Sequence, residues 1–285
     1  MPVSYRFAIC NELFQKTPFQ SVCKEVRSLG YDGLEIAPFT LGDDPASLSK
    51  SERENIVRTM EGEGLQFVGL HWLLTAPPGL HITTRDEFVR KRTWDYVYAL
   101  IDLCADLTGS ASRPPVIVFG SPKQRSSTNG CSAKKAVDVF AYELAQAAPH
   151  AEARGVKLLI EPLSPTQTDV VNTLSEAVAM VKQIDSPAVA TMFDSHNAVD
   201  ERDPHPTLVR QYAPYIRHVH VNELDGREPG MGDYDFAAIL QALADVNYSG
   251  WVSVEAFDFS RDPREIAARA INHLRARLPF AATVQ

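Results

Sequence analysis

The architecture of this chain is first visible in residues 156–163, which read Val156-Lys157-Leu158-Leu159-Ile160-Glu161-Pro162-Leu163. A short, mostly apolar run of this kind is typical of a parallel strand that is buried on both faces. The proline cannot continue such a strand, because it lacks the N–H that a ladder hydrogen bond needs. Glu161 therefore stands at the carboxyl end of a strand, where it faces any cleft that the sheet carries there.

The same pattern, an apolar run that ends in a polar side chain, recurs three times downstream. These runs lead to Asp194, His220 and Glu255, which lie 33, 59 and 94 residues after Glu161. Each interval has room for about one strand and one helix, and the carboxyl ends of all strands in a (β/α)8 barrel open on one face. A strand that merely ends at the solvent surface explains any one of these residues better than a site does. Four such residues at this spacing instead favour a shared site, where the four side chains meet at one face of the barrel.

Three carboxylates and one imidazole form a donor set that suits Mn²⁺, Mg²⁺, Co²⁺ or Zn²⁺. Cysteine, the usual ligand of structural zinc, has no place in the set. We therefore predict one divalent-cation site with the ligands Glu161, Asp194, His220 and Glu255. His218 shares a side of its strand with His220, because side chains alternate along a strand. His220 is nearer the carboxyl end and is the better ligand, while His218 is either a core histidine or a partner of the ligands.

The whole chain of 285 residues is predicted to form one α/β domain, a (β/α)8 TIM barrel over residues 1–285. Barrels of this class typically have about 250 residues. Apolar runs and helical periodicity alternate along the chain with no low-complexity linker. We expect strands over residues 3–9, 33–36, 65–70, 115–119, 156–160, 188–193, 216–219 and 251–254. We expect helices over residues 18–29, 49–64, 85–107, 132–154, 174–184, 205–212, 235–246 and 262–278.

Composition excludes several classes of protein. The net charge of −8 argues against nucleic acid as a partner, since that requires a basic face. The chain has no apolar run near the roughly 20 residues of a membrane span, and the N-terminus does not resemble a secretory signal. The four cysteines show no CxxC spacing and are typical of reduced thiols. These features predict a cytoplasmic protein, and they leave open whether it forms a homo-oligomer.

Other polar residues also follow predicted strands. His71 and Trp72 end the third strand, where the indole could form the floor under a sugar ring or simply pack. Glu35 is a polar contact or a partner of the ligands rather than a ligand. Residues 120–125 (Gly-Ser-Pro-Lys-Gln-Arg) follow the fourth strand, and Lys123 and Arg125 could bind a substrate anion there. The alternative is an ordinary solvated loop. Residues 75–84 form a long connection that favours a lid over the site.

The chain resembles the xylose isomerase-like barrel superfamily, in particular the D-tagatose 3-epimerase-like sugar epimerases and the sugar-phosphate isomerase/epimerases. The motifs that carry the resemblance are Gly30-Tyr31-Asp32-Gly33-Leu34-Glu35, Leu159-Ile160-Glu161-Pro162-Leu163, Met192-Phe193-Asp194, His218-Val219-His220-Val221-Asn222-Glu223 and Ser253-Val254-Glu255. The resemblance implies that the four predicted ligands bind one divalent cation, with Mn²⁺ favoured. It also implies that Glu161 and Glu255 flank the substrate as catalytic acid and base.

The resemblance also directs attention to substrate contacts, where this chain departs from the family. Asn197 stands where the family often has a second histidine, and His196 lies one residue earlier. Gln167 replaces a glutamate that often lies six residues after the first metal glutamate. Arg227 is offset by about one residue from a family arginine. We include His196, Gln167 and Arg227 among the expected substrate-binding residues.

Together these features predict a metal-dependent isomerase or epimerase of a sugar, keto-sugar or sugar phosphate. Proton transfer would pass through an enediolate that the cation stabilises. A lyase or dehydratase of the same superfamily, acting on a keto-sugar or cyclitol, is the first alternative. An endonuclease IV-like phosphodiesterase would need more histidines and a basic groove. A non-catalytic sugar-binding barrel would not need the metal ligands.

Overall fold

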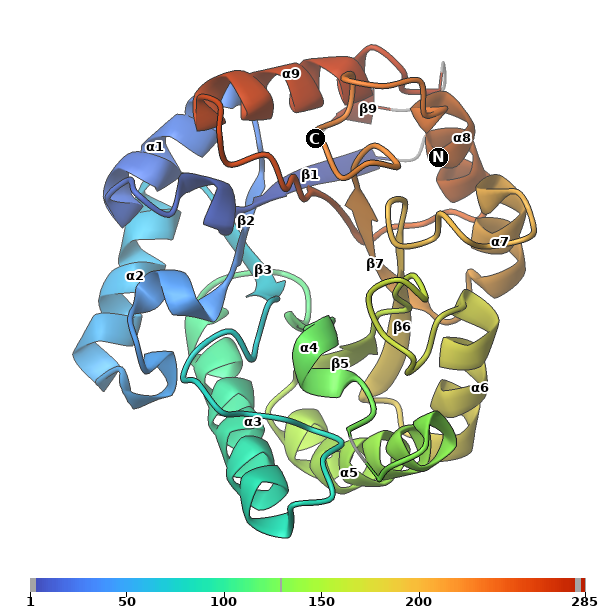
Figure 1. Ribbon diagram of the computed structural model, residues 1–285. Helices are drawn as coiled ribbons and strands as arrows, with labels where there is room; N and C mark the ends of the chain where they lie inside the picture. The colour runs from blue at the N-terminus through green and yellow to red at the C-terminus, as the bar shows by residue number, and fades with distance from the viewer. Residues whose placement is uncertain (1–3, 129, 280–282, 285) are drawn as a thin grey trace.

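The structure, a computed structural model, describes residues 4–128, 130–279 and 283–284. Parallel strands form a closed barrel in the order β2-β3-β4-β5-β6-β7-β8-β1, and β1 pairs with β2 to complete the ring (Figure 1). The barrel strands are β1 (Ser4–Cys10), β2 (Gly33–Ile36), β3 (Gln66–Leu70), β4 (Val116–Phe119), β5 (Lys157–Ile160), β6 (Val189–Asp194), β7 (Ile216–Val221) and β8 (Trp251–Val254). A two-residue strand, β9 (Thr283–Val284), pairs with the start of β1.

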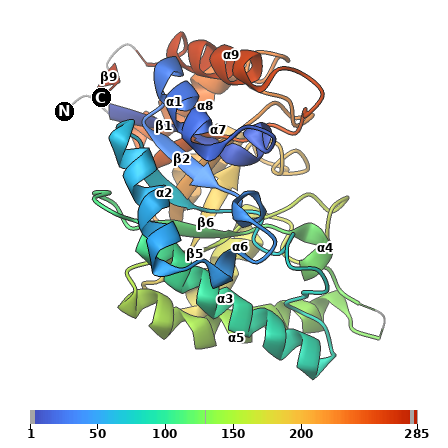
Figure 2. The same ribbon diagram turned by 90° about the vertical axis from the view of Figure 1, so that its left-hand side faces the viewer.

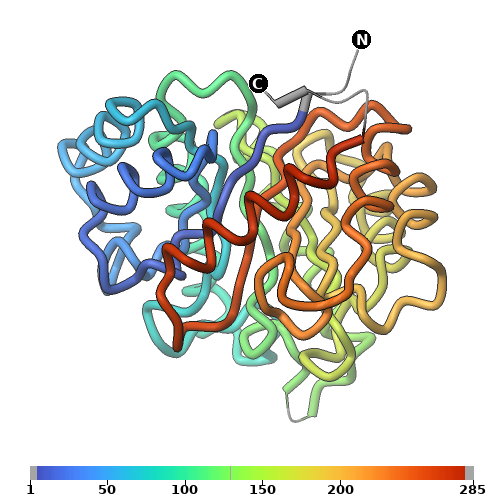
Figure 3. Tube along the Cα trace, turned by 90° about the horizontal axis from the view of Figure 1, so that it is seen from above, coloured from blue at the N-terminus to red at the C-terminus, as the bar shows by residue number. Residues whose placement is uncertain are grey.

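The helices surround the barrel (Figures 1 and 2), apart from the single-turn α4, which lies inside their ring in Figure 1. They are α1 (Phe19–Leu29), α2 (Lys50–Gly62), α3 (Glu87–Leu107), α4 (Pro122–Arg125), α5 (Ala133–Ala153), α6 (Leu174–Ile184), α7 (His205–Tyr212), α8 (Phe236–Asp245) and α9 (Pro263–Arg275). Short 3-10 helices follow β1 and β2: η1 (Asn11–Phe14), η2 (Pro38–Leu41) and η3 (Pro45–Ser47). Figure 3 shows the barrel from the side, with the segment between β4 and α5 at the end opposite the start of β1.

The predicted (β/α)8 barrel is confirmed, and most predicted elements end within a few residues of the observed ones. The predicted first residue of the first strand, Val3, lies outside the described residues. One prediction is wrong: the loop at residues 120–125 contains the single-turn helix α4. Pro122 begins that turn, a position where its missing N–H costs nothing.

The apolar filling of the barrel interior determines where the polar site begins. Side chains alternate along a strand, so Leu159 shares a face with Glu161, and Met192 shares one with Asp194. Leu159 and Met192 are fully buried in one apolar cluster with Val116, Val118 and Ala190. This layer closes the barrel beneath the polar side chains, which therefore face only the open end.

Local signals in the sequence account for the helix ends. Ser49 accepts a hydrogen bond from the backbone of Glu52, whose carboxylate accepts one from the backbone of Ser49, so the predicted capping box is present. Gly30 ends α1 with φ of 96°, a conformation that glycine adopts without a Cβ penalty. Among the described residues, no helix is both long and apolar enough to cross a membrane.

Candidate metal centre and active site

Four side chains meet at the carboxyl ends of β5 to β8. Glu161 and Glu255 directly follow β5 and β8, Asp194 ends β6, and His220 lies near the end of β7. Each offers one ligand atom, and these atoms all lie within 4.8 Å of one another. From His220 Nδ1, the distance is 3.1 Å to Glu255 Oε2, 3.6 Å to Asp194 Oδ2 and 3.9 Å to Glu161 Oε1.

The unpaired atoms of this group fit a divalent cation. Asp194 Oδ2 and His220 Nδ1 are buried, and neither has a hydrogen-bond partner in the part of the chain that the structure describes. Leaving such atoms without a partner costs about 1–3 kcal/mol each, more when the group is charged. A cation bound between them would satisfy both. Three carboxylate oxygens and one imidazole nitrogen also form the donor set that Mn²⁺, Mg²⁺, Co²⁺ and Zn²⁺ accept.

Glu35 lies behind His220 and holds its ring. Its carboxylate is fully buried, 3.1 Å from His220 Nε2 through Oε1 and 2.9 Å from His218 Nε2 through Oε2. A carboxylate on the far nitrogen of a ligating histidine fixes the tautomer and directs the other nitrogen at the metal. Glu35 therefore contacts His220, one of the four candidate ligands, while His218 contacts Glu35, and neither belongs to the group Glu161, Asp194, His220 and Glu255.

Charge balance among these buried groups shifts their proton affinities. Burial alone would raise the pKa of Glu35, but the imidazoles of His218 and His220 hold it well below its usual value. Burial raises the pKa of Glu161 to about 8, and the carboxylates of Glu255 and Asp194 add to that shift. Burial also acts on Glu255, but the nearby imidazole of His220 outweighs it and lowers the pKa.

Neutral amides and a glycine position Glu161. Asn197 Nδ2 donates to Glu161 Oε1 at 2.9 Å, and Gln167 Nε2 donates to Asn197 Oδ1 at 2.6 Å. Gly120 lies so close that a Cβ there would come within 2.3 Å of Glu161 Oε2. On the other side of the group, Trp72 Nε1 donates to Glu255 Oε1 at 2.9 Å.

The two cations predicted to bind an anion after β4 lie in different places. Arg125 is fully buried, and its Nη1 donates to the backbone oxygens of Phe119 at 2.7 Å and Glu161 at 2.8 Å. Burial lowers the pKa of Arg125 to about 10. The guanidinium therefore ties together the ends of β4 and β5, and this placement runs against both predicted alternatives, anion contact and solvated loop. Lys123, two residues earlier, is exposed and points to the cavity described next.

A cavity of about 460 Å³ opens above the two glutamates. Its lining includes six predicted site residues: Glu161, Glu255, Trp72, His196, Gln167 and Lys123. The other lining residues are Thr75, Gly120, Ser121, Pro122, Gln124, Leu163, Asn197 and Phe257. A larger cavity of about 600 Å³ lies beside α7 and α8 and contains none of the four ligands. The smaller cavity is therefore the candidate active site.

Four predicted substrate contacts do not line this cavity: His71, Glu35, Arg125 and Arg227. Arg227 pairs with the carboxylate of Asp225 at 2.7 Å. His196, which does line it, is 2.7 Å from the backbone oxygen of Leu224 through Nδ1. Thr75 is the single residue of the predicted lid, 75–84, that reaches the cavity wall.

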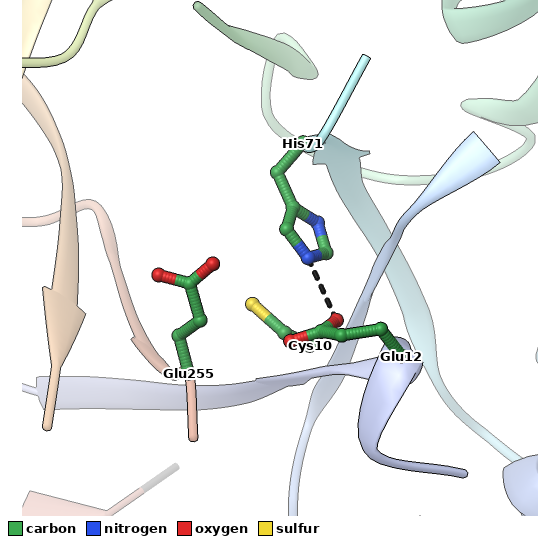
Figure 4. A group of neighbouring side chains, drawn as sticks. All are labelled: Cys10, Glu12, His71 and Glu255. Atoms are coloured by element: carbon green, nitrogen blue, oxygen red, sulfur yellow. Dashed lines mark hydrogen bonds and ion pairs between the residues drawn. The ribbon is translucent and has the colours of Figure 1, made fainter. Parts of the chain in front are cut away.

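Sequence reasoning missed a buried group next to Glu255 (Figure 4). His71 Nε2 lies 2.7 Å from Glu12 Oε2, and the Cys10 thiol and the Glu255 carboxylate lie beside this pair. Glu12 is in η1, two residues after β1 ends, so the pattern of strand followed by carboxylate would have found it. Phe257 was also missed, while Asn197 and Gly120 were noted in the sequence but not assigned to the side of Glu161.

Known proteins with similar sequences include sugar 3-epimerases. A sequence profile described as xylose isomerase-like TIM barrel matches residues 23–277. A D-psicose 3-epimerase from Agrobacterium fabrum is 36% identical over 252 residues, which cover 84% of this chain and 79% of that protein. A fructoselysine 3-epimerase from Shigella flexneri is 22% identical over 284 residues, which cover 93% of this chain and 95% of the relative.

The fold is also found in solved structures. The crystal structure of a D-psicose 3-epimerase with D-tagatose, from Clostridium cellulolyticum H10, superposes with a TM-score of 0.83. The superposition covers 96% of this chain and 99% of the other, with 22% identity. At that identity the likeness concerns the fold alone.

Proposed function

The chain belongs to the xylose isomerase-like TIM barrel family, and we propose that it is a divalent-metal-dependent sugar epimerase or isomerase. One observation carries the proposal. Glu161 and Glu255 converge on a four-ligand group from β5 and β8, and both line one cavity. Two carboxylates at one reacting centre can remove a proton from one face of a substrate and return it to the other.

In this reaction the two glutamates would transfer the proton, and neighbouring side chains would hold the reacting groups in place. A bound divalent cation would polarise the substrate carbonyl and acidify the adjacent C–H. One glutamate takes that proton on a carboxylate oxygen, which leaves a planar enediolate, and the other delivers a proton from the opposite side. Glu35 holds the His220 ring, while the amide of Asn197 holds Glu161. If the proton returns to the carbon that lost it, the configuration of that carbon is inverted. If the proton goes to the neighbouring carbon, the carbonyl group moves along the chain of the sugar.

The relatives named above support a ketose or keto-sugar as the substrate, with epimerisation beside the carbonyl. The amide pair Gln167–Asn197 stands where the resembling family often has a glutamate and a histidine. An amide pair contacts hydroxyl groups without adding charge. We therefore infer a site that reads neutral hydroxyls near Glu161.

Lys123 bears on which substrates the site accepts. Among the described residues that line the cavity, it is the sole lysine or arginine. A phosphate or carboxylate on the distal end of the sugar would form a charge-assisted contact with it. This supports sugar phosphates or sugar acids as substrates beside neutral ketoses.

A product screen tests the proposed function. The protein, loaded in turn with Mn²⁺, Mg²⁺, Co²⁺ and Zn²⁺, would be given ketoses, keto-glycosides and their phosphates. We expect an epimer or isomer of at least one, with Mn²⁺ as the favoured metal. A dehydrated product would instead identify a lyase, and no product with any substrate would contradict the proposal. A Lys123→Ala variant in the same screen should lose affinity about tenfold for anionic substrates and keep it for neutral ones.

The remaining expectations concern context. All four cysteines are free and buried, which supports the expectation of a cytoplasmic protein. Oligomeric state is measured directly by light scattering during the same purification. A second copy of this chain remains the expected partner if the protein is not monomeric.

A further inference from the structure

Trp72 has a backbone conformation that bulky residues rarely adopt. Its φ is 51°, in the left-handed region. For a residue other than glycine, asparagine or aspartate, this conformation costs on the order of 1 kcal/mol or more, and it persists only where the surroundings enforce it. Such an outlier at the end of a barrel strand is a reason to ask what the side chain does.

Both flanks of Trp72 are anchored. On one side, buried His71 bonds to Glu12, and on the other, Leu73 and Leu74 are buried in the core. The strained backbone therefore places the indole in one position, over the mouth of the barrel.

Aromatic neighbours fix the plane of the indole. Its ring centroid lies 6.1 Å from that of Phe257 at an interplanar angle of 30°, and 6.0 Å from that of Phe39. Phe259 meets it edge-on at 6.4 Å. With three rings around it, the indole is held at both backbone and ring, so the direction of its N–H is fixed as well.

That N–H is directed at one oxygen of Glu255. Trp72 Nε1 donates to Oε1 at 2.9 Å, whereas Oε2 lies 3.1 Å from His220 Nδ1, within the ligand group. The two oxygens of one carboxylate are thus distinguished by their partners. Indole N–H donates only, so it cannot take up or supply the transferred proton.

We propose that Trp72 is a positioning residue that turns Glu255 so that Oε2 faces the metal ligands and Oε1 faces the cavity wall. The indole prevents rotation of the carboxylate. Only Oε2 can then face the cation, and Oε1 cannot turn toward it as well. One oxygen is then kept for proton transfer. The catalytic consequence rests on the proposed function, but the orientation of Glu255 does not.

NMR of the indole N–H groups tests the orientation without any substrate. The chain has three tryptophans, so a ¹⁵N–¹H spectrum contains three indole signals. The signal missing in Trp72→Phe identifies Trp72. We expect that signal to move in Glu255→Gln and on titration with diamagnetic Mg²⁺. The Trp94 indole donates to the backbone oxygen of Ile82 at 3.2 Å and serves as the internal control.

A Trp72 signal that moves no more than that of Trp94 would overturn the proposal. The measurement uses the metal-free and Mg²⁺-loaded protein, and it remains decisive even if no sugar is turned over. Failure of the proposed function and failure of this inference are therefore seen in different experiments.

Kinetics test the consequence. Trp72→Phe keeps an aromatic ring and removes the N–H, and we expect kcat to fall about 10- to 100-fold, with KM changed much less. Trp94→Phe also keeps an aromatic ring and removes an indole N–H, but that N–H donates to the backbone oxygen of Ile82 and Trp94 does not line the cavity, so this variant should retain kcat within about threefold. If Trp72→Phe fails to fold, a benzothienyl analogue at position 72 provides the same ring without the N–H. Unchanged kcat in a folded variant without the N–H would overturn the proposed role.

Discussion

The two sides of the candidate metal centre present the same residue type in different surroundings. Glu161, after β5, lies among carboxylates and is held by a neutral amide chain, and its pKa is raised to about 8. Glu255, after β8, lies against the imidazole of His220 and an indole N–H, and its pKa is lowered. Surroundings rather than residue type thus separate the proton affinities of two equivalent strand-end glutamates, as in other enzymes with paired carboxylates.

The largest effect is expected where the two sides meet. His220→Ala and Asp194→Ala each remove a candidate ligand atom that has no hydrogen-bond partner among the described residues, so both should abolish binding of the divalent cation. Elemental analysis of purified wild-type protein should find about one divalent ion per chain, lost on chelation. Circular dichroism checks that the variants still fold. Full metal occupancy in either folded variant would contradict the ligand assignment.

The second largest effect is expected on turnover, when each glutamate is replaced separately. Glu161→Gln and Glu255→Gln should each lower turnover by about 10² or more, the usual range for a positioned acid or base. Each amide oxygen can still coordinate, so partial metal binding should remain. Single-turnover assays with both epimers would show whether each variant fails on a different face. A variant with wild-type turnover would remove that glutamate from the mechanism.

A glycine distinguishes the Glu161 side sterically. Gly120→Ala places a Cβ within 2.3 Å of Glu161 Oε2, and the flexible end of that side chain must move. Since only the carboxylate is displaced, the fold should persist while metal affinity falls about 10- to 100-fold. Isothermal titration measures this, with Gly62→Ala as the matched control, because a Cβ there meets no described atom within 4 Å apart from its chain neighbours and its own helix backbone. Equal affinities in the two variants would show that Glu161 is not held at Gly120.

The smallest effect is a difference in proton release. A carboxyl with a pKa of about 8 is mostly protonated at pH 7 in the metal-free protein and mostly ionised at pH 9. A cation must displace that proton, so release on binding should fall by about 0.8 proton between pH 7 and pH 9. Calorimetry in buffers of different ionisation enthalpy counts it. Glu161→Gln should lose this difference. Glu255→Gln should retain a smaller difference, because the Glu255 carboxylate contributes to the raised pKa of Glu161. A full loss in Glu255→Gln with no change in Glu161→Gln would contradict the assignment of the raised pKa to Glu161.

The sequence predicted most of the fold and the convergence of four candidate ligands for a simple physical reason. Parallel strands of a barrel all end on one face, so a residue at the end of an apolar run has a known location before any contact is known. Glu161, Asp194, His220 and Glu255 were therefore found from strand ends alone. The same rule extends to Glu12, which was missed because it lies within the 3-10 turn η1, two residues beyond the end of β1.

Side-chain direction within loops could not be predicted in this way. Lys123 and Arg125 lie on one turn of helix, and two residues along a turn face different directions. Lys123 faces the cavity, whereas Arg125 is buried at the ends of β4 and β5. The contact between Trp72 and Glu255 spans 183 residues and depends on a left-handed backbone, and neither feature leaves a local pattern.

Turnover in D2O tests most directly the central claim that two glutamates carry the proton. A metal-loaded sample would be given the substrate found by the screen, and the product would be analysed by NMR and mass spectrometry. We predict one deuterium at the carbon that changes, because a proton held on a carboxylate exchanges with solvent. Product that forms at the same rate without deuterium would contradict this mechanism and favour direct hydride transfer between carbons.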